Sequence, residues 1–160
     1  MIEIRPFQQK DFDVLLDLAN QAVPFAPVEN AEWWEYRKAF DESRRTSRHY
    51  LALTGKQAVG YGCLEQQSDA PALLRVYVVC SLANLQGEVG DRLYAQLMRD
   101  AAELGAAQLW ARELQADAPI REFFLSRGFA ETRHFTMPGH PPMVVLEFDL
   151  RPALRPAVAE

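Results

Sequence analysis

A strand, a glycine-bearing loop and a long helix in the middle of the chain limit its fold more than any other feature. The apolar, β-branched run over residues 73–79 is typical of a buried strand. A loop of about ten residues with Gly87 and Gly90 follows, and then an amphipathic helix that stops at Gly105. Such a connection turns backbone N–H groups and a helix N-terminus toward an anion. A phosphate-bearing ligand is therefore the first hypothesis, and an ordinary strand-to-helix turn is the alternative.

The composition predicts one globular domain. With 160 residues, of which 49% are apolar, the chain can bury a sizeable core. We expect a single domain over residues 1–150 and a loose, proline-broken tail over residues 151–160. The net charge of -5 argues against a nucleic-acid partner. Neither a membrane span nor a signal peptide is recognisable, so no membrane partner and a cytoplasmic location are expected.

The cysteines and histidines do not predict a metal site. Cys63 and Cys80 lie in apolar, strand-like segments without the spacing of a metal motif, so buried reduced thiols are expected. The three histidines are scattered along the chain. None has a partner at the spacing of metal ligands, and we predict that no metal is bound.

The hydrophobic patterns of the remaining chain predict further strands and helices. Strands are predicted at residues 2–5, 49–54, 57–66, 108–114, 129–136 and 143–150, and helices at residues 10–22, 30–45 and 117–128. The order is therefore β α α β β β α β α β β. Gly60 and Gly62 share one strand face, which is left open to a backbone, to a side chain such as Trp34, or to a ligand.

Aromatic residues near the second predicted helix are candidates for a binding site. Trp33 and Trp34 are adjacent, so they point about 100° apart on a helix and do not both enter one core. One of them is a candidate for a binding groove or for a contact in a homodimer. Phe25, in an apolar loop, either returns to the core or lines a site. Tyr61 and Tyr77 could line the same site, although aromatic strand residues are more often core.

Together with this order, two segments resemble the GCN5-related N-acetyltransferase family. They are LQGEVGDRL at residues 85–93 and DAPIREFFLSRGF at residues 117–129. The family has a pyrophosphate loop R/Q-x-x-G-x-G/A that leads into a helix, and later a segment N-x-x-A-x-x-F-Y-x-x-x-G-F. The resemblance covers residues 2–150 and extends to a branch in which two such domains often occur in tandem. It implies an α/β (α+β) fold, a mixed sheet of about seven strands with four helices, an antiparallel N-terminal meander and a V-shaped splay between strands 4 and 5.

The resemblance also implies a site for acetyl-CoA. Backbone amides of the loop would hold the pyrophosphate, and the strand before the loop would pair with the pantetheine arm. The implied cofactor-binding residues are Val78, Val79, Leu85, Gln86, Gly87, Glu88, Val89, Gly90, Asp91, Asp117, Phe123 and Phe124.

Three departures from the family pattern affect this site. Glu88 occupies the position of the first loop glycine, where a carboxylate close to a pyrophosphate would be repelled by about 1 to 4 kcal/mol. The loop also carries about two residues more than the family form before Gly90. Phe124 stands where the family has the tyrosine that protonates the leaving thiolate, and Ser126 or water is the possible substitute.

The resemblance implies direct attack of an amine on the thioester, assisted by a base. The base candidates are Glu65, Glu113 and Glu32. The alternative for each is a solvated glutamate without a catalytic role. The leading function is an acetyl-CoA-dependent N-acetyltransferase acting on a small-molecule amine or a peptide N-terminus. The alternative is a non-catalytic acyl-CoA sensor, or a dimerising module, that has kept the fold with an eroded site.

Overall fold

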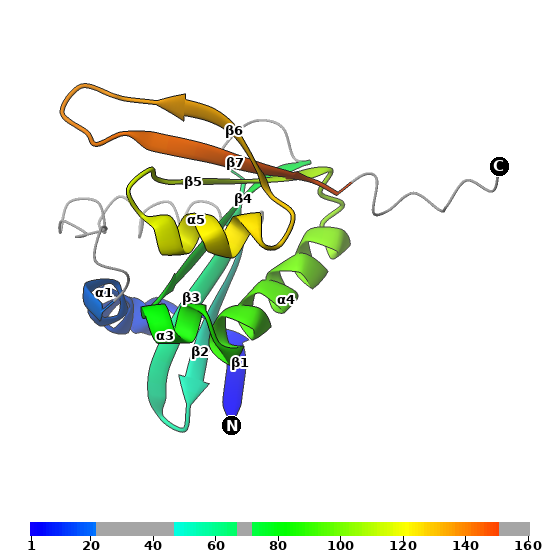
Figure 1. Cartoon of the computed structure of the whole chain (residues 1–160). Helices are drawn as coiled ribbons and strands as arrows, with labels where there is room; N and C mark the ends of the chain where they lie inside the picture. Colours follow the sequence, from blue (N-terminus) through cyan, green and yellow to red (C-terminus); the bar gives the residue numbers. More distant parts are fainter. Residues whose placement is uncertain (22–46, 67–71, 151–160) are drawn as a thin grey trace.

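The computed structural model describes residues 1–21, 47–66 and 72–150, and its centre is one mixed sheet of seven strands (Figure 1). The strand order is β1-β2-β3-β4-β5-β7-β6, and β4–β5 is the parallel pair while the other neighbours are antiparallel. This confirms the predicted mixed sheet. The strands are β1 (Ile2–Pro6), β2 (Arg48–Thr54), β3 (Gln57–Glu65), β4 (Leu73–Cys80), β5 (Gln108–Leu114), β6 (Ala130–Phe135) and β7 (Met143–Asp149).

Four α-helices lie in the described residues, with a short 3-10 turn η1 (Gln9–Asp11) before the first of them. Asp117 begins the last helix and accepts a hydrogen bond from the Ile120 backbone N–H, with proline in the first turn as predicted. The predicted helix at residues 30–45 lies outside the described residues. The helices are α1 (Phe12–Gln21), α3 (Leu82–Leu85), α4 (Glu88–Glu103) and α5 (Ala118–Leu125).

One face of the sheet is covered by α4 and α5. An added Cβ at Gly60 would lie 2.8 Å from Val89 Cγ1 and 2.9 Å from Leu93 Cδ1, and one at Gly62 would lie 3.1 Å from Leu97 Cδ1. The two glycines therefore leave room for the side chains of α4. Of the possibilities that the sequence left open, a packed side chain is the one observed among the described residues, and α4 supplies it.

The opposite face carries α1. Leu15 and Leu18 of this helix pack with Leu51 and Tyr61 in a second buried cluster. Phe7 completes it, with its ring edge-on to the Tyr61 ring at a centroid distance of 5.1 Å. Apolar side chains thus alternate between two cores along the central strands, as the period of two along a strand requires.

Strands β4 and β5 pair only at their beginnings and then diverge. Three residue pairs are in register, and the last of them is Arg75 with Trp110. Beyond that point β1 to β4 run at a steep angle to β5, β7 and β6 (Figure 1). The predicted splay between strands 4 and 5 is therefore present, and it leaves an opening between the two halves of the sheet.

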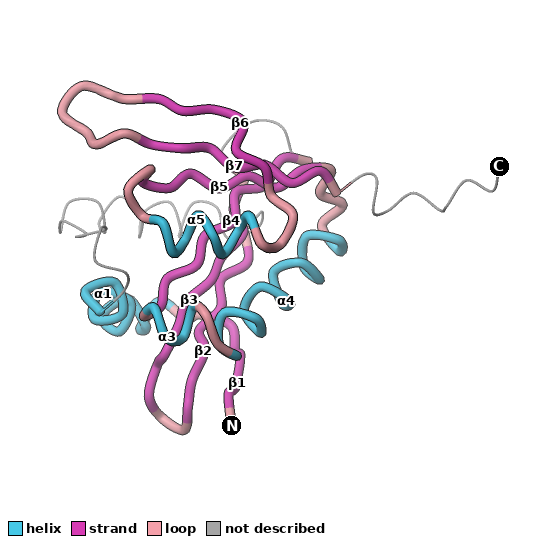
Figure 2. The backbone as a smooth tube through the Cα atoms, viewed as in Figure 1, coloured by secondary structure: helices cyan, strands magenta, loops and turns pink. Residues whose placement is uncertain are grey.

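The connection from β4 to the long helix differs from the predicted loop. It contains α3, a single short turn beside the start of α4 (Figure 2). Gly90 belongs to the first turn of α4 rather than to the loop, because Gly87 is the N-cap residue. The helix ends as predicted, with Gly105 at a φ of +72°, a conformation that favours glycine.

Candidate functional site

The outer edge of β4 is open where the two halves of the sheet separate. Residues 76–80 pair with β3 on one side, and within the described residues none of them pairs with β5 on the other. The segment includes Val78 and Val79, whose side chains are buried in the two opposite cores. Its free backbone groups can therefore pair with an extended ligand in the opening.

The first turn of α4 presents backbone donors without acceptors. Gly87 gives no side-chain cap, and in the described part of the chain no hydrogen bond is made by the N–H groups of Glu88, Val89 and Gly90. The N–H of Asp91 is the first to bond, to the Gly87 carbonyl at 3.3 Å. Three free donors at the positive end of a 16-residue helix favour an anion.

Both loop glycines are also required by the chain's own backbone. An added Cβ at Gly90 would lie 2.3 Å from the Leu85 carbonyl oxygen and 3.1 Å from Phe123 Cε2. One at Gly87 would lie 3.0 Å from the Ala83 carbonyl oxygen. The turn of α3 thus packs directly against the start of α4, so these glycines alone do not indicate a ligand.

The Glu88 side chain points to solvent. It is 69% exposed, and its carboxylate lies 3.6 Å from Arg92 one turn along the helix. A carboxylate in the first turn also interacts favourably with the helix dipole. Its repulsion of a bound anion is consequently weakened by water and by the neighbouring guanidinium.

A groove of about 210 Å³ separates the α3–α4 turn from α5. Arg127 stands at its edge, with its guanidinium 3.7 Å from the centroid of the Phe123 ring and 2.5 Å from an Asp91 carboxylate oxygen. Arg127 was not among the predicted site residues. It lies in the turn directly after α5, and the available signal was a basic residue four positions after Phe123. The groove is lined by Leu85, Gln86, Pro119, Glu122, Phe123, Ser126 and Arg127.

The residues of α5 that the resemblance assigned to the site divide between the groove and the core. Phe123 lines the groove, whereas Phe124 is fully buried and packs against Phe123 and Phe129. Ser126 lines the groove, and its hydroxyl donates to the Phe123 carbonyl at 3.1 Å. Asp117 is buried as the cap of α5 rather than exposed at the groove.

Of the three predicted base candidates, Glu113 has the most unusual environment. It is half-buried, and its Oε1 is enclosed without a hydrogen-bond partner. Burial raises the pKa of Glu113 to about 8, with Arg75 acting in the opposite direction. Glu65 is buried and lies 3.8 Å from Arg75. Glu32 lies outside the described residues.

Glu113 flanks the opening on the face of α4 and α5. Leu74 of β4 is paired with Leu109 of β5, so continuation of the parallel register would bring Val78 opposite Glu113. Because the strands have separated there, these two residues border the opening from opposite sides. A proton acceptor thus stands across from the free edge of β4.

The aromatic candidates for the acceptor site have different positions. Tyr61 is fully buried, and its hydroxyl is 2.6 Å from His49 Nδ1, so it belongs to the core and does not line a site there. Tyr77 is half-buried on the α1 face of β4, beside Arg75. Phe25, Trp33 and Trp34 lie outside the described residues.

The described residues hold neither a metal-binding cluster nor a membrane-spanning helix. No group of three or more histidine, cysteine, aspartate or glutamate side chains in residues 1–21, 47–66 and 72–150 has an arrangement that could hold a metal ion. No helix in these segments is long and apolar enough to span a membrane.

Comparison with solved structures identifies the fold as that of GCN5-related N-acetyltransferases. A proposed acetyltransferase from Salmonella typhimurium, solved with acetyl-CoA, has a TM-score of 0.76 at 13% identity, over 99% of this chain and 99% of that chain. The ribosomal-protein-S18-alanine N-acetyltransferase of Escherichia coli has a TM-score of 0.74 at 13% identity, over 100% and 99% of the two chains. An acetyltransferase of the GNAT family from Streptococcus pneumoniae has a TM-score of 0.67 at 12% identity, over 93% and 99%.

These similarities concern the fold of the whole chain. No protein-family model matches the sequence, and no curated protein matches it. The chain thus has the GNAT fold, including the mixed sheet, the parallel β4–β5 pair and the helices that the resemblance implied. The tandem arrangement stays a prediction.

Proposed function

We propose that this protein is an acetyl-CoA-dependent N-acetyltransferase that acts on a primary amine of a small molecule or a peptide N-terminus. The observation that carries the proposal is the opening after Arg75, where the free edge of β4 leads directly to the uncapped first turn of α4. Acetyl-CoA would supply there a thioester from which an amine can take the acetyl group.

The described residues fit this cofactor. The edge of residues 76–80 can pair with the amide groups of a pantetheine arm, and the N–H groups of Glu88, Val89 and Gly90 can bind a pyrophosphate. Arg127 adds a positive charge at the groove, partly neutralised by its ion pair with Asp91. An anionic ligand would compete with Asp91 for this guanidinium.

Glu113 is the group that we propose as the base. An amine that is to attack must lose a proton, and a carboxylate with a pKa of about 8 is matched to this task near neutral pH. Its place beside the opening, across from Val78, supports the role. Glu65 has a competing partner in Arg75, which favours Glu113 between the two.

No described residue on the buried side of α5 replaces the missing tyrosine hydroxyl. Phe124 offers no proton, and the Ser126 hydroxyl is engaged with a backbone carbonyl. A thiol has an ordinary pKa of about 8.5, so its thiolate can leave near neutral pH without a positioned acid. We therefore expect turnover that is slowed by about 100- to 10,000-fold relative to a site with such an acid.

Titration calorimetry with acetyl-CoA, followed by thiol release across a panel of amines, tests the proposal. Binding with amine-dependent thiol release is expected. The absence of both heat and thermal stabilisation at millimolar acetyl-CoA would contradict it. At the groove, Arg127→Gln should weaken the binding of acetyl-CoA. The matched control is Arg133→Gln on the exposed face of β6, which should leave binding unchanged.

A non-catalytic acyl-CoA sensor is the second candidate. The complete burial of Phe124 favours it, because the position that would hold a catalytic hydroxyl is part of the core. Binding of acetyl-CoA without thiol release from any amine would support this function over the enzyme.

A further inference from the structure

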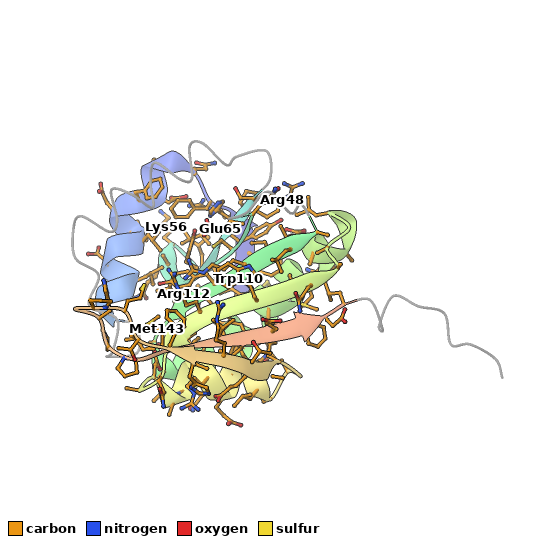
Figure 3. All side chains as sticks on the ribbon, turned by 90° about the horizontal axis from the view of Figure 1, so that it is seen from above. Arg48, Lys56, Glu65, Trp110, Arg112 and Met143 are labelled. Carbon is orange, nitrogen blue, oxygen red and sulfur yellow. The ribbon has the colours of Figure 1, made fainter. Side chains whose placement is uncertain are left out.

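Two arginines lie together on the α1 face of the opening. Arg75 is the last β4 residue paired with β5, and Arg112 follows its partner Trp110 by two residues. Alternate strand residues share a face, so both arginines lie on the face of Trp110 and of Glu65, which is paired with Arg75. Figure 3 shows Glu65, Trp110 and Arg112 on this face of the sheet.

Within the described residues, the hydrogen-bonding capacity of this pair is largely unused. Arg75 is 12% exposed, and its Nε is enclosed without an acceptor. Its guanidinium lies over the rings of Tyr77 and Trp110, at 5.3 and 5.7 Å from their centroids, and 3.8 Å from Glu65. A buried cation with an unmade hydrogen bond is costly unless an anion supplies the acceptor.

Arg112 has even fewer partners. It is half-buried, and no hydrogen bond or ion pair joins its guanidinium to another group in the part of the chain that the structure describes. Burial, and then the charge of Arg75, lower the pKa of Arg112. An anion placed between the two guanidinium groups would offset both effects.

The neighbouring carboxylates do not remove this excess of positive charge. Glu65 lies beside Arg75, and Glu113 is the other acidic group that acts on both arginines. Burial raises the pKa of Glu113 to about 8, so most of its charge is absent at neutral pH. Among the described residues, two cations thus face little more than one anion.

We propose that the acceptor is a small amine that also carries a carboxylate, as an amino acid does, and that Arg112 binds this carboxylate with support from Arg75. The inference rests on the acetyltransferase function proposed above. Arg112 directly precedes Glu113, so the two side chains leave β5 on opposite faces, although the charges of both arginines act on Glu113 at the opening. An acceptor whose carboxylate pairs with Arg112 must therefore extend through the opening to bring its amine to Glu113, as an amino acid with an amine in its side chain can.

The chemistry also excludes a competing class of acceptor. A polyamine would bring two or more positive charges to a pair of arginines, and like charges repel strongly where water is partly excluded. The amide of an amino acid, or the amine left after its decarboxylation, would lose the ion pair with Arg112. The acceptor preference is thus acid over amide, and amide over polyamine.

Thiol release with acetyl-CoA tests this preference on the twenty L-amino acids, their amides and spermidine. For at least one amino acid we expect kcat/KM to exceed that of its amide by about tenfold or more, since a charge-assisted pair is lost. Arg112→Gln should raise the KM for that acid about ten- to a hundredfold and leave the KM for its amide unchanged. Arg133→Gln removes the same charge from exposed β6 and should change neither value.

A readout without turnover keeps the two proposals separable. Amino acids should raise the melting temperature of the wild-type protein and should not raise that of Arg112→Gln. This readout does not depend on transfer of the acetyl group. Turnover of amides or spermidine at rates equal to the acids would overturn the acid-bearing acceptor and leave the acetyltransferase standing. Selective binding of acids without thiol release would contradict the enzyme and support Arg112 as an acid-binding residue. The inference would be overturned if no amino acid were bound and none were acetylated.

Discussion

At the scale of single residues, Glu113 decides how the proposed reaction depends on pH. A base must be unprotonated to act, so kcat/KM should rise with pH until about 8, where burial places the pKa of Glu113. Glu113→Gln should lower kcat/KM about 100- to 10,000-fold and remove this rise. The measurement is a pH–rate profile of both proteins with the same amine.

The control for this profile is Glu103→Gln, which removes a carboxylate from the exposed end of α4. It should follow the wild-type curve. Since the amine substrate titrates equally with every variant, a rise that persists in Glu113→Gln would assign the pKa to the substrate and not to Glu113.

Gly90 is a residue at which alanine should destabilise the fold. In an ordinary helix, replacing glycine by alanine stabilises by about 1 kcal/mol. At this position the new methyl group would meet the Leu85 carbonyl oxygen at 2.3 Å, and such overpacking costs about 1–3 kcal/mol. Urea unfolding of Gly90→Ala should therefore show a net loss of stability, whereas exposed Glu88→Ala should stay within about 0.5 kcal/mol of wild type.

At the scale of elements, α5 depends on its N-cap. Asp117 accepts the hydrogen bond of the Ile120 N–H, and Asp117→Ala should lower the free energy of unfolding by about 1 kcal/mol. The same change should weaken acetyl-CoA binding, because α5 carries the groove residue Phe123 and the turn after α5 carries Arg127. Asp117→Asn keeps a capping oxygen, so it should retain both stability and affinity; equal losses in the two variants would show that the charge matters more than the cap.

The effect of Glu88, which stands in place of the family's first loop glycine, can be tested in the first turn of α4. Glu88 is exposed and close to Arg92, so its repulsion of a pyrophosphate is screened. Glu88→Gln should tighten acetyl-CoA binding by no more than about tenfold, with a gain that shrinks as salt is added. Calorimetry at two salt concentrations measures this, and a large gain independent of salt would place the carboxylate against the ligand.

At the scale of the whole molecule, stability should fall between pH 6.5 and pH 8. Burial raises the pKa of Glu113 from 4.5 to about 8, so the folded protein binds the proton more tightly than the unfolded chain does. The stability that this proton provides is present below pH 4.5 and is lost as pH rises to 8, by at most about 1.4 kcal/mol per pH unit.

His49 acts in the opposite direction over a lower range. Burial lowers its pKa from 6.5 to about 4, so its contribution to stability is present above 6.5 and is lost as pH falls. The two effects oppose each other between pH 4.5 and 6.5, and above 6.5 the effect of Glu113 is left. Denaturant unfolding at pH 6.5 and 8 should show a decline in the wild type that is smaller in Glu113→Gln.

Local patterns in the sequence were sufficient for much of the architecture. The alternation in β1, β6 and β7, the glycine that ends α4, and the pairing of Asp117 with Pro119 at the start of α5 each depend on residues a few positions apart. Their conformations follow from backbone sterics and from the hydrophobic period. The family resemblance added the splay, which no local pattern encodes.

The site depended on contacts between segments distant in the sequence. Gly90 meets a carbonyl of α3, Phe124 is enclosed by the core, and Arg127 reaches from the turn after α5 to Asp91 of α4. None of these neighbours is visible in the chain itself, because each requires two elements to be packed in a particular orientation.

The strand, turn and helix at the centre of the chain, and the resemblance they share with the 117–129 segment, were therefore determined by the sequence alone. The tertiary structure decided what surrounds them: an exposed Glu88, an enclosed Glu113, and Arg75 and Arg112 on one face of the opening. Hydrophobic periodicity fixes which face of an element is buried, whereas charge, burial and pKa depend on what the neighbouring strands and helices bring into contact with it.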